Sequence, residues 1–227
     1  MRNRIIIVTA AASGLFGLSA LPAAAAPGGA APATARAGQV CTNVQLSGAL
    51  PAPPAGLAVQ QEVTIGADCK PRLGAVRLVP ATGARAVPRA AAAGAATRQV
   101  KSWSEMYDCC NIRMTGLSTT STWNTEGNRI TTAATEARQE WNREPWNAGW
   151  SLKSSSKTAD CLTDCTVSRN EAHAEFSYKG IFDTTGDWYA NKHHSYVDLK
   201  ADGTASCRFD VELKHSFVGW NLQRGCA

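Results

Sequence analysis

The strongest structural signal in the chain is the alternation of apolar and polar residues along residues 196–217. From Cys207 onward every second residue is apolar, which is the period of a strand with one buried and one wet face. Residues 201–203 form a turn signal in which Gly203 suits a positive φ. A two-residue loop would place Val197 opposite a charged side chain, whereas a three-residue loop places it opposite Cys207. The sequence therefore predicts an antiparallel hairpin with a three-residue loop.

A second alternating stretch covers residues 171–182. Its even positions from Ala172 to Tyr178 are apolar, and its odd positions are polar, so another strand is predicted there, followed by a turn at residues 183–187. Residues 130–141 carry apolar side chains at helical spacing and predict one short helix, although their threonines also suit a strand. The fold class that these patterns predict is mainly β: an antiparallel β-sandwich with at most one short helix.

Residues 1–25 have the three parts of a secretory signal. Arg2 and Arg4 precede an apolar run that ends near Leu18, and small residues follow up to Ala25. The run is short for a membrane span and lacks a basic flank that would stop transfer, so cleavage is favoured over anchoring. No later stretch reaches about 20 apolar residues, the length that a spanning helix needs. We expect a secreted, extracellular product without membrane insertion after signal cleavage.

The cysteines number eight, and an even count in an exported chain favours complete pairing as structural disulfides. They are Cys41, Cys69, Cys109, Cys110, Cys161, Cys165, Cys207 and Cys226. Their spacings give a zinc site little support, so we expect no metal and no cofactor. We predict the pairs Cys41–Cys69 and Cys207–Cys226. The adjacent Cys109 and Cys110 point to opposite sides of an extended chain, so each is expected to pair with one cysteine of the 161/165 pair.

Aromatic residues divide the chain near residue 101. All seven Trp and all four Tyr lie from Trp103 onward, whereas residues 26–100 are rich in Ala, Pro and Gly. Such a composition buries too little apolar surface to offset its ordering entropy. We expect residues 26–100 to be a flexible arm, or a pro-segment cut at Arg89 or Arg98, with a small hairpin stapled by its two cysteines. Residues 101–227 are expected to form the disulfide-stabilised β domain.

The charge balance changes at the same boundary. The chain carries a formal net charge of +5, but residues 101–227 contain more acidic than basic side chains. A nucleic-acid-binding domain would present a basic face with interleaved aromatic residues. The predicted folded part lacks that balance, and the sequence therefore argues against a nucleic-acid partner.

The sharpest catalytic candidates are Glu171, His173 and Glu175, which share the polar face of one predicted strand. Two carboxylates beside an imidazole can bind a metal or act as general acid and base, particularly if His194 or Asp198 lies on the adjoining strand. The alternative is the charge-paired solvent face of an antiparallel sheet, which we favour. The chain has no HExxH, GxSxG, P-loop or dinucleotide motif, so the sequence leans away from an enzyme.

Trp146, Trp150 and Trp188 are the candidates for ligand binding. An indole offers a large, flat apolar surface, and closely spaced tryptophans suit a platform on which a sugar ring stacks. The alternative is that these side chains fill the core of a small β domain, and we give it more weight.

The layout as a whole resembles a group of known proteins. An Ala- and Arg-rich signal, a Pro/Ala-rich arm and a compact domain bearing Trp and Cys resemble the small secreted disulfide-bonded proteins of actinobacteria, most of which have no assigned function. The arm and head are also similar in layout, though not in residues, to adaptor subunits of the secreted umbrella toxin particles of that group.

The leading functional hypothesis is a non-enzymatic extracellular binding or adaptor domain that acts on a protein or glycan partner. It rests on the missing catalytic motifs and on an arm that is able to order on binding. One alternative is a secreted hydrolase that uses the Glu/His cluster. Another is an inhibitor or toxin with a removable pro-segment.

Overall fold

The structure, a computed structural model, describes residues 39–81, 97–143 and 149–227, all within one unit of the chain. The predicted signal at residues 1–25, Arg89 and Trp146 lie outside the described residues. The described residues form twelve strands: β1 Val40–Leu50, β2 Leu57–Ile65, β3 Pro71–Leu73, β4 Arg77–Pro80, β5 Arg98–Tyr107, β6 Arg113–Glu126, β7 Arg129–Trp141, β8 Gly149–Ala159, β9 Val167–Lys179, β10 Ala190–Lys200, β11 Ala205–Phe217 and β12 Asn221–Cys226. Within these residues there is no helix of the length and hydropathy that crossing a membrane requires.

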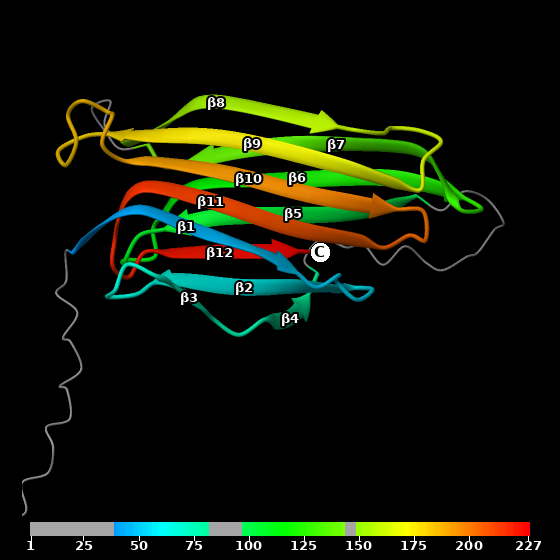
Figure 1. Cartoon of the computed structure of the whole chain (residues 1–227), viewed down its shortest axis with the longest axis horizontal. Helices are drawn as coiled ribbons and strands as arrows, with labels where there is room; N and C mark the ends of the chain where they lie inside the picture. Colours follow the sequence, from blue (N-terminus) through cyan, green and yellow to red (C-terminus); the bar gives the residue numbers. More distant parts are fainter. Residues whose placement is uncertain (1–38, 82–96, 144–148) are drawn as a thin grey trace, which may run out of the picture. The chain divides into compact units, whose positions relative to one another are not determined.

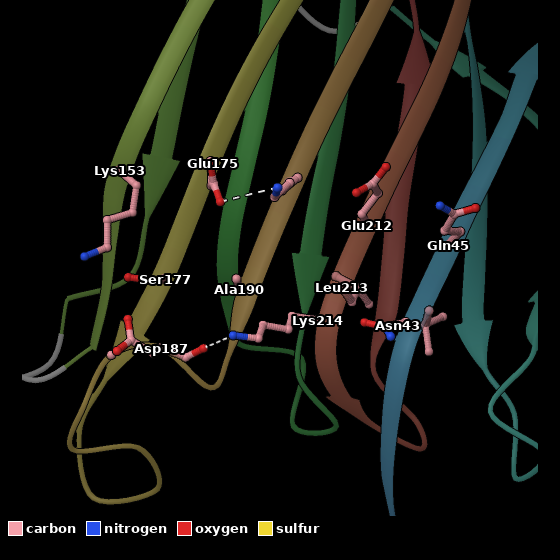
Figure 2. Close-up of a pocket in the computed structure, with 13 residues that line it drawn as sticks. Asn43, Gln45, Lys153, Glu175, Ser177, Asp187, Ala190, Glu212, Leu213 and Lys214 are labelled. Carbon is pink, nitrogen blue, oxygen red and sulfur yellow. Dashed lines mark hydrogen bonds and ion pairs between the residues drawn. The ribbon is translucent and has the colours of Figure 1, made fainter.

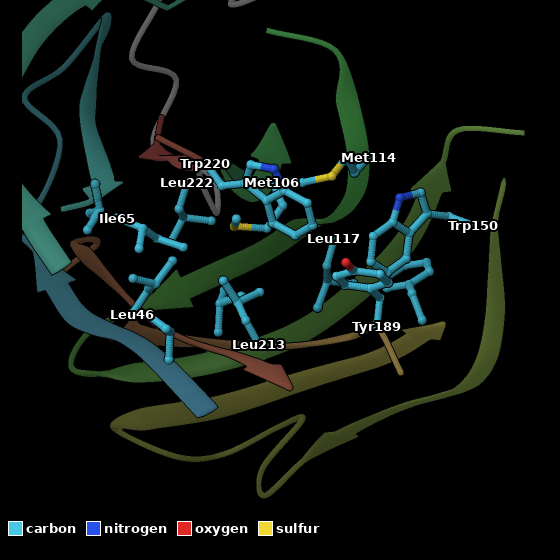
Figure 3. Close-up of a cluster of buried hydrophobic side chains, with 14 of the residues drawn as sticks. Leu46, Ile65, Met106, Met114, Leu117, Trp150, Tyr189, Leu213, Trp220 and Leu222 are labelled. Atoms are coloured by element: carbon cyan, nitrogen blue, oxygen red, sulfur yellow. The ribbon is translucent and has the colours of Figure 1, made fainter. Parts of the chain in front are cut away.

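The strands form two antiparallel sheets that pack face to face. One has five strands in the order β1-β11-β10-β9-β8, and the other has seven in the order β3-β2-β12-β5-β6-β7, with β4 beside β2 (Figure 1). Side chains from both sheets share the buried core, for example Leu46, Leu213 and Leu222 (Figure 3). The predicted fold class, a mainly-β antiparallel sandwich, is confirmed.

The hairpin of β10 and β11 confirms the predicted loop length. Val197 lies opposite Cys207, and the Gly203 N–H donates to the Lys200 carbonyl at 3.0 Å. Gly203 has a φ of +85°, the region in which a glycine is favoured. β9 also forms where the alternation predicts it, but its connection to β10 runs from residue 180 to residue 189 and is longer than the predicted turn.

The predicted boundary at residue 101 is wrong for the described part of the arm. β1 pairs with β11 over its whole length, and β2 pairs with β12, so residues 40–80 belong to both sheets. Arg98, an expected cleavage point, begins β5 and pairs with Trp123. The prediction used only the apolar content of residues 40–80 themselves. In the structure, the strands of this segment bury alternate residues against the aromatic core that later strands provide.

The predicted helix at residues 130–141 is also wrong, because these residues form strand β7. β7 pairs with β6 in an antiparallel ladder in which Trp123 lies opposite Ala133, with one register shift between Asn124 and Thr125. Thr131 and Thr135, like other β-branched residues, fit a pleated surface better than a helix. The long neighbouring strand therefore decides the conformation that the local spacing left open.

Two predicted disulfides are confirmed, and both join the two sheets. Cys207–Cys226 links β11 to β12, and Cys41–Cys69 links β1 to the turn after β2, so the latter does not staple a separate hairpin. The expected pairing of the other four cysteines is wrong. Cys161 pairs with Cys165 across a short loop, and the Cys109 and Cys110 thiols are free, with their sulfurs 3.6 Å apart.

The physical reason for this difference lies in the turn after β5. Cys109 and Cys110 lie in a tight turn rather than in an extended segment, and the following Asn111 has a φ of +61°. The Asp108 carboxylate accepts hydrogen bonds from the N–H groups of Cys110 and Ile112, both at 2.8 Å. Because the turn is closed in this way, the two thiols lie on the same side of it.

The interior also contains a buried polar layer centred on His193. Its Nδ1 lies 2.9 Å from the Ser104 hydroxyl, and its Nε2 lies 2.9 Å from the Thr115 hydroxyl. Burial lowers the pKa of His193 to about 3, so the ring is neutral at physiological pH. A second contact of the same kind joins Ser102 to Ser195 across the sheets at 2.8 Å. Side-chain hydroxyls thus tie β10 to β5 and β6.

Candidate functional site

The three catalytic candidates lie on the outer face of the five-stranded sheet. His173 on β9 is directly opposite His194 on β10, and their Nδ1 atoms are in hydrogen-bond contact. The Nε2 atom of His173 is 3.4 Å from the Glu171 carboxylate, whereas Glu175 pairs with Lys192 at 3.6 Å. The strand therefore joins Glu171 to His173 but directs Glu175 to a different partner.

The surroundings of His173 and His194 are those of a charge-paired surface. Arg208 lies 3.7 Å from the centre of the Tyr196 ring and forms an ion pair with Asp210. Partial burial and the neighbouring His173 lower the pKa of His194, which keeps that imidazole mostly neutral. Neither His173 nor Glu171 lines any of the clefts described below. Among the described residues, no group of three or more His, Cys, Asp or Glu side chains is arranged to hold a metal.

Glu175 does line a cleft, which opens on the same sheet beside the 180–189 connection. The cleft has a volume of about 520 Å³, and its ionisable groups are lysines and carboxylates (Figure 2). Lys192 is paired with Glu175, and Lys214 donates to the Asp187 main-chain carbonyl. Such a lining suits a hydrophilic, charged surface of a partner, because it offers both signs of charge across several strands.

Of the three tryptophans proposed from the sequence, Trp146 lies outside the described residues, and the other two have different surroundings. Trp150 is only 6% exposed and packs edge-on against Tyr178, with ring centres 5.7 Å apart. Trp188 is 50% exposed, but one face of its ring is stacked on His215 at 3.9 Å. Trp150 is thus a core residue of β8, whereas Trp188 is a half-exposed residue of the 180–189 connection.

A different tryptophan, Trp103, lies on the outer face of the seven-stranded sheet. Odd residues of β5 face outward, so Trp103 shares that face with Lys101 and Glu105 and is partly exposed. Both of its cross-strand neighbours are small, namely Gly225 on β12 and Ser118 on β6. A Cβ atom at Gly225 would lie 1.9 Å from Trp103 Cζ2, so the indole covers the bare backbone of β12.

The register extends this arrangement into a row across the sheet, which we call the Trp103 row. Its members are Arg77 on β4, Gln60 on β2, Gly225 on β12, Trp103 on β5, Ser118 on β6 and Arg138 on β7. Neighbouring strands lie about 4.8 Å apart, so the row spans roughly 24 Å. The indole is at its centre, and side chains able to form hydrogen bonds lie at both ends.

Clefts flank the indole on both sides. The cleft toward β2 has a volume of about 510 Å³ and is lined by glutamine, arginine and glutamate side chains, and the cleft toward β7 has about 390 Å³. The side-chain amides of Gln60 and Gln223 have no hydrogen-bond partner among the described residues. A free amide offers donors and an acceptor together, which matches neighbouring hydroxyl groups of a ligand.

The edge of the larger cleft is fixed from beneath by Arg224, which is 2% exposed. Its Nη2 donates to Gln61 Oε1 at 2.7 Å, and Gln61 Nε2 donates in turn to the Gly74 carbonyl at 2.9 Å. Burial lowers the pKa of Arg224, although its ordinary value is so high that the side chain remains charged. This chain of contacts holds the backbone between β3 and β4 beside the indole.

Sequence reasoning missed Trp103 even though its parity was readable. In residues 99–104 the even positions hold small or apolar side chains, and the odd positions 99 and 101 hold Gln and Lys. An odd-numbered tryptophan therefore falls on the solvent-facing side of that strand. The glycine beneath the ring belongs to the last strand, and no local pattern connects the two. Comparison with known proteins adds no function, since no protein-family model, curated protein or solved structure matches this chain.

Proposed function

We propose that the protein is a non-enzymatic extracellular binding domain whose ligand is a glycan held on the Trp103 row. The observation that carries the proposal is the partly exposed Trp103 indole lying over Gly225, with clefts on both sides. The disulfides in the described part of the chain are typical of extracellular proteins and support that location.

The chemistry of the row matches that of a sugar ring. A pyranose has an apolar face of C–H groups, which packs on an aromatic ring, and a rim of hydroxyl groups that need hydrogen-bond partners. Trp103 supplies the apolar surface, and the amides of Gln60 and Gln223 supply adjacent donors and acceptors. The row is also long enough for several sugar units, because it crosses six strands.

The hydrolase alternative has less support. A general acid and base act on a substrate held within hydrogen-bond reach in a site that limits water, and Glu171 and His173 lie on an open sheet face. If the cluster is catalytic, His173→Ala and Glu175→Ala will abolish an activity found in the wild-type protein. Unchanged activity in both variants would remove this alternative.

Replacing Trp103 with alanine is expected to weaken glycan binding at least about tenfold, which corresponds to roughly 1.4 kcal/mol of lost packing on the ring. Gly225→Ala should have a similar effect, since its Cβ would force the indole out of position. Binding is measured by retention on insoluble polysaccharides and a glycan array, followed by calorimetry with the best oligosaccharide. Melting temperatures of both variants report whether the fold survives.

The matched control is Trp188→Ala, which removes an exposed indole far from this row in sequence and should leave glycan affinity unchanged. Equal glycan affinity of the wild-type protein and Trp103→Ala would contradict the proposal. A different result would be that no polysaccharide is retained and a protein from culture supernatant is captured instead. If Lys153→Glu, in the cleft that Glu175 lines, abolishes that capture, the binding function belongs to this cleft.

A further inference from the structure

A fourth cleft, distinct from the three already described, opens where the core reaches one end of the sandwich. It has a volume of about 320 Å³ and lies between the turn at residues 108–112 and the 180–189 connection. Its walls are mostly aromatic: the lining includes Trp150, Tyr178, Tyr189, Phe217 and Trp220. Figure 3 shows Trp150, Tyr189 and Trp220 together at this part of the core. We call it the aromatic cleft.

The walls of the aromatic cleft are fixed by contacts between the rings. Tyr189 lies at the centre, with its ring 6.2 Å from that of Tyr178 and 6.2 Å from that of Trp220. Trp150 and Trp220 are each less than a tenth exposed, so packing restricts their rotamers. A cleft built from such side chains is formed before any ligand arrives, which reduces the entropy cost of binding.

The rim carries exposed apolar side chains in a connection of defined shape. Phe182 is 71% exposed and Ile112 is 51% exposed, and both line the cleft. The Asp183 carboxylate accepts hydrogen bonds from the N–H groups of Gly186 at 3.1 Å and Trp188 at 2.7 Å, which orders the 180–189 connection. The opening is therefore apolar at its edge and supported from within.

Unused hydrogen-bond donors define what the cleft accepts. Among the described residues, the indole N–H groups of Trp150 and Trp220 and the Tyr189 hydroxyl have no hydrogen-bond partner. Of the residues that the structure describes, no lysine, arginine or histidine lines the cleft, and Asp108 is the one carboxylate that does. One oxygen of Asp108 accepts two backbone N–H groups. The described lining residues thus combine apolar surface with unpartnered neutral donors, which suits an uncharged ligand with acceptor oxygens.

We propose that the aromatic cleft binds a small, uncharged, planar aromatic molecule that bears carbonyl or ether oxygens. Ring surfaces on the ligand pack against Tyr189 and Trp150, and its oxygen accepts a hydrogen bond from the Trp220 indole. The site is separate from the Trp103 row, since the two share no lining residue.

The test uses coumarin as an acceptor-bearing probe and naphthalene as an apolar probe of similar size, titrated into the full chain by calorimetry. We expect saturable 1:1 binding of coumarin, about fivefold tighter than that of naphthalene, because one neutral hydrogen bond contributes about 1 kcal/mol. Trp220→Phe keeps the ring and removes the donor, so it should remove the coumarin preference and leave naphthalene binding unchanged. Near-ultraviolet circular dichroism checks the packing of this variant.

A second variant tests the rim without touching the core. Phe182→Ser should weaken the binding of both probes several-fold. The control is Leu162→Ser, which also replaces an exposed apolar side chain with serine but lies outside this cleft; Leu162 is 55% exposed, and its replacement should leave the binding of both probes unchanged. Absence of saturable binding of both probes, or equal coumarin affinity in Trp220→Phe and the wild-type protein, overturns the proposal. Binding to phosphatidylcholine vesicles that is lost in Phe182→Ser, without coumarin binding, would assign the rim to a lipid surface instead.

Discussion

Replacing His193 with alanine is expected to lower the free energy of unfolding by about 4 kcal/mol. The change leaves a cavity beside Phe176 and leaves the buried hydroxyls of Ser104 and Thr115 without their shared partner. His193→Gln should cost less, about 2 kcal/mol, because an amide retains one donor and one acceptor. The surface neighbour His194 provides the control, and His194→Ala should change stability by only about 0.5 kcal/mol.

The same residue predicts an acid sensitivity with a defined sign. The pKa of His193 is about 3 in the folded protein and about 6.5 in the unfolded chain, so between these values the unfolded chain binds one more proton. The contribution of His193 to stability is therefore constant above about pH 6.5 and falls by roughly 1.4 kcal/mol for each pH unit between pH 6.5 and pH 3. The lowered pKa of Asp183, about 2, acts in a separate and more acidic range.

Urea unfolding at pH 7 and pH 5 measures both effects. The wild-type protein should lose about 2 kcal/mol between these two values through His193. His193→Gln should lose less, because the variant lacks this imidazole and keeps only the smaller effect of His194, whose pKa is also lowered. If His193→Gln keeps the full pH dependence, a different group is responsible. A wild-type-like midpoint for His193→Ala at pH 7 would show that the polar layer contributes little to stability.

The parts of the fold that the sequence predicted correctly are those set by neighbours along the chain. The β10–β11 hairpin follows from alternation and one glycine turn, since parity alone places Val197 opposite Cys207. The Cys207–Cys226 disulfide follows from a tail that has to fold back on the same core. Such features can be predicted from the local residue pattern and one further constraint, such as loop parity or a cysteine that needs a partner.

The errors arose where a distant strand decides the conformation. Residues 130–141 show helical spacing, but β6 offers a long antiparallel partner, and the segment becomes β7. In the same way, β1 is a poor strand by itself and is stabilised by its pairing with β11. An arm was predicted because the partner of each strand lies far along the chain.

The candidate site depends on distant strands even more than the conformations of β1 and β7 do. That Trp103 faces outward is readable from the alternation of β5, but its value as a surface depends on Gly225 and Ser118 being its neighbours. Those neighbours are set by the order β12-β5-β6, which brings the last strand beside the fifth. Sequence reasoning therefore chose tryptophans that are close in sequence and missed the one at the centre of the sheet.

Removing the Cys207–Cys226 disulfide is the second change with a large expected effect. The two cysteines are 19 residues apart and almost fully buried, so the double variant Cys207→Ala/Cys226→Ala should lower the free energy of unfolding by about 3 kcal/mol or more. The control is Cys161→Ser/Cys165→Ser, which removes a disulfide between half-buried cysteines only 4 residues apart and should cost about 2 kcal/mol or less. Urea unfolding under non-reducing conditions compares the two variants.

Removing this disulfide should also weaken glycan binding at the Trp103 row, because Cys226 follows Gly225, which the Trp103 indole covers. The disulfide holds the end of β12 against β11, and without it Gly225 is anchored only by its ladder to β2 and β5. Weaker glycan binding at a urea concentration that leaves the variant folded would connect the staple to the Trp103 row. Unchanged affinity in that variant, beside a clear loss in Gly225→Ala, would show that the ladder alone fixes the position of the indole.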